Sequence, residues 1–83
     1  MNNQPLIEQI TAIVEAYRIG EDSYANRLFP DFIGQLQLCV DTGQIDVDIQ
    51  SLTELLDAMF NAQNMQNYTW LADLMEYHLM PAL

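Results

Sequence analysis

The amino-acid sequence predicts an all-α fold: a small antiparallel four-helix bundle made by one domain over residues 1–83. Three observations predict it. Apolar side chains recur three and four residues apart in four segments, which is the helical period. Short polar breaks separate the segments, and short connections favour antiparallel neighbours. No stretch alternates apolar and polar residues over more than a few positions, so no strand is predicted.

The first helix is predicted over about Gln4–Ile19. Its apolar residues at helical spacing are Leu6, Ile7, Ile10, Ile13, Val14 and Tyr17. Asn3 can cap its start, and Pro5 suits the first turn because an amide there needs no helical partner. Gly20 fits the C-terminal stop.

The second helix, over roughly Asp22–Val40, contains a proline. Its main apolar stripe is Ala25, Leu28, Phe32, Leu36 and Cys39, widened by Phe29, Ile33 and Val40. Pro30 removes a backbone donor and clashes with the carbonyl four residues earlier, so one kinked helix is predicted. A short helix followed by a second one that starts at Pro30 is the alternative.

The third helix is predicted to start near Asp46 or Asp48, after a turn at Gly43, and to run to about Asn64. Ser51 with Glu54 also matches a capping box, which leaves the start open by about three residues. Its apolar face is Ile49, Leu52, Leu55, Leu56, Met59 and Phe60.

The fourth helix is predicted over Tyr68–Met80. Asn67 is its expected N-cap, and Pro81 ends it. Leu71, Leu74, Met75 and His78 lie along one face.

Composition excludes several classes of protein. The chain has 12 acidic residues, two arginines and no lysine, for a net charge of −10, yet 51% of its residues are hydrophobic. The apolar content argues against disorder, and the scarcity of cations argues against binding nucleic acid or an anionic membrane. No apolar run is long enough to span a membrane, and the N-terminal residues lack a basic segment. A cytoplasmic protein is therefore expected.

No residue pattern predicts an enzyme, a metal site or a cofactor. The acidic residues around Asp41 fail the calcium-loop spacing, because Gly43 and Ile45 stand where oxygen ligands are needed. His78 is the sole histidine and has no companion at ligand spacing, so it is expected at a core edge or an interface. Cys39 lies on an apolar stripe and is expected to act as a small hydrophobe.

Large apolar side chains exceed what the four stripes need: five Met, four Tyr, three Phe and one Trp. Such residues are enriched in grooves that accept amphipathic helices, although Met also fills irregular core gaps. The expected protein-binding anchors are the off-stripe residues Trp70, Tyr77, Leu38 and Phe29. The expected acidic rim is Asp57, Asp73 and Glu76.

The C-terminal residues carry a family resemblance. Ala62-Gln63, a polar break, and then Leu71-Ala72-Asp73-Leu74, Glu76-Tyr77, Leu79 and Pro81 resemble the ending of small acidic, uncharacterised bacterial helical proteins. His78 departs from the acidic residue more usual there. The resemblance implies a helical bundle and brings no activity. The overall plan is also similar to flagellar export chaperones, by architecture alone.

These observations lead to the expectation of a non-catalytic, chaperone-like module that offers an apolar groove with an acidic rim to a helical or basic segment of another protein. The alternative is an acidic mimic that binds a basic protein in place of nucleic acid. A homodimer through the fourth helix is a further possibility.

Overall fold

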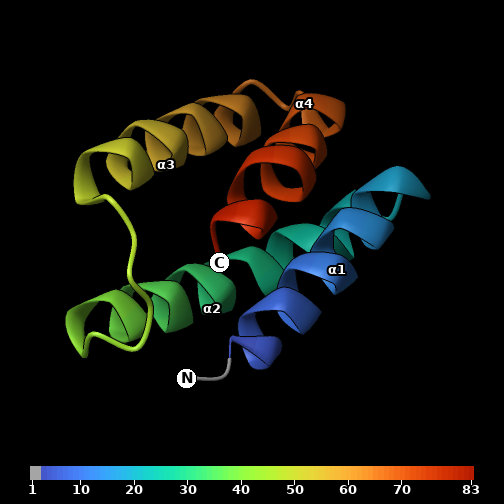
Figure 1. Ribbon diagram of the computed structural model, residues 1–83. Helices are drawn as coiled ribbons and strands as arrows, with labels where there is room; N and C mark the ends of the chain where they lie inside the picture. Colours follow the sequence, from blue (N-terminus) through green and yellow to red (C-terminus); the bar gives the residue numbers. More distant parts are fainter. Residues whose placement is uncertain (1–2) are drawn as a thin grey trace.

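The computed structural model describes residues 3–83, which form four helices in the predicted order (Figure 1). Their bounds are α1, Gln4–Arg18; α2, Asp22–Asp41; α3, Ile49–Asn64; and α4, Tyr68–Asp73. The helical backbone continues beyond α4 as a π-helix, η1 (Leu74–Leu79), and a 3₁₀ turn, η2 (Met80–Ala82). No strand occurs in this part of the chain, which confirms the all-α prediction. Met1 and Asn2, which the predicted domain includes, lie outside the described residues.

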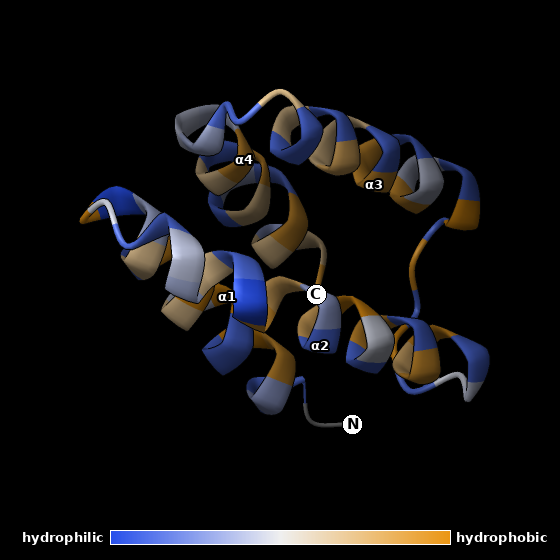
Figure 2. Cartoon of the chain, turned by 180° about the vertical axis from the view of Figure 1, so that it is seen from behind, coloured by the Kyte–Doolittle hydropathy of each residue, from blue (hydrophilic) through white to orange (hydrophobic). Residues whose placement is uncertain are grey.

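The four helices leave one side of the fold open. Helices α1 and α2 form an antiparallel hairpin, and α4 with η1 packs between α1 and α3 (Figure 1). Helices α2 and α3 run antiparallel but stand apart, joined at one end by residues 42–48. Figure 2 shows the same separation from behind. A regular up-and-down bundle would bring these two sequence neighbours into close backbone contact.

The core draws on every helix. Its most deeply buried side chains, each 0% exposed, are Ile10, Ile13, Ala25, Phe32, Met59, Ala62, Leu71, Met75 and Leu79. Several buried positions are alanines, and small side chains allow neighbouring helices to approach closely. The helical periodicity therefore located most of the core correctly.

Helix α2 passes through Pro30 without a break. The helix is assigned continuously from Asp22 to Asp41, and Pro30 lies on its exposed side. Proline cannot supply the amide that would bond the carbonyl of Asn26. Of the two arrangements considered, a single helix is the one formed.

The three turns that follow α1, α2 and α3 share one geometry. In each, two bonds close the helix end; after α3, for example, the amide of Asn67 donates to the carbonyl of Ala62 at 2.9 Å. This Schellman motif needs a residue with positive φ. Gly20 (φ 82°) and Gly43 (φ 74°) supply it in the first two turns, as predicted, whereas Gln66 (φ 59°) occupies the third.

Replacing Gln66 with glycine should stabilise the fold. A residue with a Cβ is strained in the left-handed region, so Gln66→Gly is expected to raise the free energy of unfolding by about 0.5–1 kcal/mol. Urea unfolding measures it. Gly43→Ala is the matched control with the opposite sign: its Cβ would meet no atom within 4 Å, so backbone strain alone should destabilise it. Equal effects of the two substitutions would contradict this account.

The starts of the helices agree in part with prediction. Asn67 caps α4, its side-chain oxygen accepting from the amide of Trp70 at 3.3 Å. Asp48 is the N-cap residue of α3, where Ser51 donates to its carboxylate at 2.7 Å. Asn3 precedes α1, but its side chain donates to the backbone oxygen of Leu83 at 2.6 Å instead of capping.

The π-helix η1 changes which side chains face the core. Its bonds span five residues instead of four, so each turn contains about one more residue than an α-turn. His78 is consequently exposed, whereas Leu79, four residues after Met75, is fully buried. The prediction that His78 continues the apolar stripe is wrong, because it assumed regular α-helical spacing as far as Met80.

Candidate functional site

An apolar groove lies on the open side of the fold, between α2 and α3. One part of it is a hollow of about 130 Å³ at the C-terminal half of α2 and the N-terminal half of α3. Its lining residues are Ile33, Leu36, Gln37, Val40, Ile49, Leu52, Thr53 and Leu56. Six of these eight side chains are aliphatic, so the hollow is suited to an apolar occupant.

The groove exists because each helix has a second apolar stripe beside its core stripe. On α2 the second stripe includes Ile33 and Val40, and on α3 it includes Ile49 and Leu56; each pair is seven residues apart and shares a helix face. Separation of α2 from α3 leaves these side chains only partly covered. Ile49 is 57% exposed, and it adjoins Leu52, which is buried beneath.

A second hollow, which shares no lining residue with the first, lies farther along α2 and α3 and is more polar. The ring of Phe60 on α3, 44% exposed, meets Phe29 of α2 edge to face with centroids 5.9 Å apart. Beyond Phe60 lies an open hollow of about 670 Å³. It is lined by Asn26, Phe60, Asn61, Gln63, Asn64, Gln66 and Tyr68. Five of the seven are amides, and we call this region the amide end and the aliphatic region the apolar end.

Two acidic residues adjoin side chains that line the apolar end. Asp41 follows Val40 directly and accepts a bond from Gln37 at 2.9 Å, and Asp48 directly precedes Ile49. Asp57, expected as part of an acidic rim, is exposed on α3 but does not line the hollow. Within residues 3–83, neither Asp41 nor Asp48 forms an ion pair with an arginine.

A polar network joins all four helices beneath the amide end. The Tyr17 hydroxyl and the Gln63 amide both donate to the Asn26 side-chain oxygen, and Asn26 donates to the Tyr68 hydroxyl at 3.1 Å. The rings of Tyr17 and Tyr68 stack with centroids 4.9 Å apart. Burial raises the pKa of Tyr17 to about 12, a hydrogen bond with Gln63 opposes the rise, and Tyr68 and Asp22 add to it.

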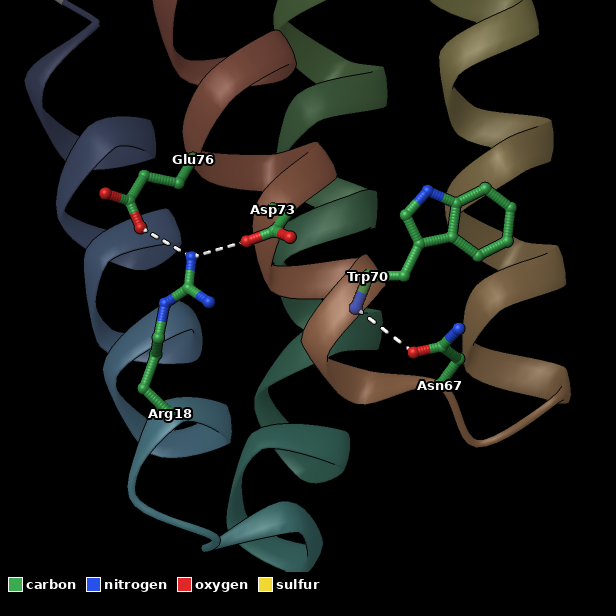
Figure 3. A network of polar contacts seen from close by, with 5 residues as sticks. All are labelled: Arg18, Asn67, Trp70, Asp73 and Glu76. Carbon is green, nitrogen blue, oxygen red and sulfur yellow. Dashed lines mark hydrogen bonds and ion pairs between the residues drawn. The ribbon is translucent and has the colours of Figure 1, made fainter.

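The predicted anchors do not form one surface. Phe29 is 2% exposed and belongs to the core, so its prediction as a surface anchor is wrong. Leu38 is 54% exposed but lies nine residues from Phe29, half a rotation around α2, and therefore faces away from the groove. Trp70 and Tyr77 are exposed on α4 and η1, and the Trp70 indole points towards α3 in Figure 3.

The expected rim residues Asp73 and Glu76 are paired with a cation. A single nitrogen, Nη2 of Arg18, lies 2.9 Å from a carboxylate oxygen of each. These bonds join the end of α1 to α4 and η1, and they hold the pKa of Arg18 above its usual value. Figure 3 shows both carboxylates directed towards α1 and Trp70 directed towards α3. They therefore do not make a free acidic rim around Trp70.

Cys39 and His78 were the other residues considered as reactive or metal-binding groups. Cys39 is partly exposed, and its thiol donates to Gln44 at 3.7 Å. His78 lines a separate hollow of about 290 Å³ with Asp46 and Asp48. Among residues 3–83, no group of three His, Cys, Asp or Glu side chains is placed to hold a metal ion. None of the helices in this range is long and apolar enough to cross a membrane.

Sequence reasoning assigned the groove residues to the core. Ile49, Leu56 and Phe60 were expected on the buried face of the third helix, and Ile33 and Val40 on a widened stripe of the second. The sequence feature that could have indicated a groove was the width of these apolar faces, because each is wider than a single stripe that faces the core. Residues Asn64–Asn67 were interpreted only as a polar break between helices, and Asn61–Asn64 as the end of the third helix and the start of the family resemblance.

Comparison with known families matched residues 4–83 to a domain of unknown function, DUF8042. Comparison with curated proteins and with solved structures gave no match.

Proposed function

Since the chain belongs to the DUF8042 family, which supplies no activity, we propose from the site itself that the protein is a binding module. Its occupant would be a basic amphipathic helix of another protein, held in the groove between α2 and α3. The observation that carries this proposal is the aliphatic hollow between two helices that leave each other uncovered. Helix-in-groove binding uses this arrangement: an amphipathic helix lays its apolar face between two others.

The size of the groove suits a helix of three to four turns. The two hollows together extend on α2 from Asn26 to Val40, which corresponds to about 21 Å at 1.5 Å per residue. A helix of about 14 residues spans that length. Ile33, Val40, Ile49 and Leu56 would contact its apolar face, and Phe60 would close the middle of the groove.

Charge favours a basic occupant. The groove lies in a chain of net charge −10, and Asp41 and Asp48 adjoin residues that line its apolar end. Complementary charge accelerates encounter with Lys- or Arg-rich helices and disfavours acidic ones. Both arginines are already engaged, Arg18 with two carboxylates and Arg27 over the ring of Tyr24 at 5.7 Å.

Two matched variants test the site. The probe is a 14-residue fluorescein-labelled peptide with leucine at helical spacing and lysine elsewhere, and its anisotropy reports binding. Ile49→Glu should weaken binding about tenfold or more, because it places a charge in the aliphatic hollow. Leu38→Glu adds the same charge at an equally exposed position on the far side of α2, and should change the affinity less than twofold. Circular dichroism checks that both variants are folded.

Equal loss of affinity in the two variants would place binding outside the groove. Salt separates the proposal from the acidic-mimic alternative. At about 0.5 M salt the screening length is roughly 4–5 Å, so binding that rests on charge alone disappears, whereas apolar burial leaves measurable affinity. Complete loss at that salt concentration would favour the mimic.

A further inference from the structure

The two ends of the groove differ in chemistry, and that difference gives the groove a direction. At the apolar end Gln37 donates to Asp41 and Asp48 directly precedes Ile49, whereas the far end is lined mostly by uncharged amides. A helix is also asymmetric: its first turn carries partial positive charge and unpaired N–H groups, and its last turn carries partial negative charge and unpaired carbonyls.

Three amides at the amide end are available to a ligand. Within residues 3–83, the side chains of Asn61, Asn64 and Gln66 make no hydrogen bond, and all three are exposed. Each offers two N–H donors and one carbonyl acceptor. The other two amides, Asn26 and Gln63, are already bonded to each other in the network below.

The backbone of Gln66 is strained. It has positive φ where the equivalent positions of the other two turns are glycine, and its side chain lines the amide end. Strained backbone of this kind often marks functional positions. Glycine at this position would relieve the strain but remove one of the three free amides.

We propose that the amide end receives the C-terminal turn of the bound helix, whose first turn then lies at the acidic, apolar end. The side-chain N–H groups of Asn61, Asn64 and Gln66 would donate to the unpaired carbonyls of that last turn. Asp41 and Asp48 would face the positive end of its dipole. Because α3 runs from Ile49 to Asn64, the occupant would lie parallel to α3 and antiparallel to α2. This inference rests on the proposed function.

Paramagnetic broadening in NMR spectra tests the direction. The probe is the lysine–leucine peptide, amidated at its C-terminus and carrying a nitroxide amino acid at either its first or its last residue. A nitroxide at the first residue should broaden the backbone amides of Val40 and Ile49. A nitroxide at the last residue should broaden the side-chain NH₂ signals of Asn61 and Asn64. Methyl shifts of Ile33 and Leu56 with the unlabelled peptide report groove binding independently.

The outcomes separate the two proposals. Methyl shifts of Ile33 and Leu56 would show that the peptide binds in the groove. If the nitroxide at the first residue then broadened the signals of Asn61 and Asn64, or if both nitroxides broadened the same signals, the proposed direction would be wrong while groove binding would be supported. Absence of methyl shifts would overturn the groove and the direction together. Affinity gives a second readout: Asn64→Ala should weaken binding about three- to tenfold, whereas Gln35→Ala, an exposed amide on the far side of α2, should not. Equal effects of these two substitutions would also overturn the direction.

Discussion

Phe32→Ala is expected to lower the free energy of unfolding by about 3–5 kcal/mol, the largest effect of any single substitution considered. The Phe32 ring is 0% exposed and lies in the core to which all four helices contribute. Truncation removes the favourable free energy of burying the ring. It also leaves a cavity that the surrounding side chains fill only in part. Urea unfolding monitored by circular dichroism measures the loss.

Two further variants keep this test informative in a domain of only 83 residues. Phe32→Leu should cost less than Phe32→Ala and remain folded. Leu38→Ala, on the exposed side of α2, should cost less than about 0.5 kcal/mol. Ile10→Ala, fully buried, should exceed Leu55→Ala, because Leu55 is only partly buried. Similar costs for Phe32→Ala and Leu38→Ala would contradict the core described here.

Stability should fall by about 2–3 kcal/mol between pH 10 and pH 12 through Tyr17 alone. Unfolded tyrosine ionises near pH 10, whereas burial raises the pKa of native Tyr17 to about 12. Between these values the native state binds more protons than the unfolded state, so the free energy of unfolding decreases as pH rises. The contribution is fully present below pH 10 and is lost above pH 12.

The measurement compares wild type with Tyr17→Phe. The variant is expected to be less stable at pH 7, because Asn26 loses its hydroxyl donor, but its stability should fall less steeply above pH 10. Chemical denaturation at pH 9, 10 and 11 gives both slopes. Parallel profiles would show that Tyr17 ionises equally in the native and unfolded states.

The helices were predictable from sequence because each has local signals. Helical apolar spacing, glycines with positive φ after α1 and α2, and the Asn67 cap all act within a few residues. The π-helical turns of η1 were not predictable in this way, because they depend on packing between helices. His78 was misplaced for that reason.

The kind of binding site could be predicted from the sequence, but its position could not. An apolar groove near acidic residues was expected, but its position depends on which helices pack together. Leu38 and Phe29 illustrate the problem: one lies on the far side of α2 and the other is buried, although both are large apolar residues of one helix. Likewise, pairing of Asp73 and Glu76 with Arg18 joins residues 55 and 58 positions apart.

The most direct test of the central claim is the location of a bound helix. Intermolecular NOEs would be measured between the leucine methyls of the lysine–leucine peptide and the methyl and aromatic protons of the protein. We predict contacts to Ile33, Ile49 and Leu56, and none to Ile19 or Leu38, which are exposed outside the groove. Contacts concentrated at Trp70 and Tyr77 instead would contradict the account and return the binding surface to α4 and η1.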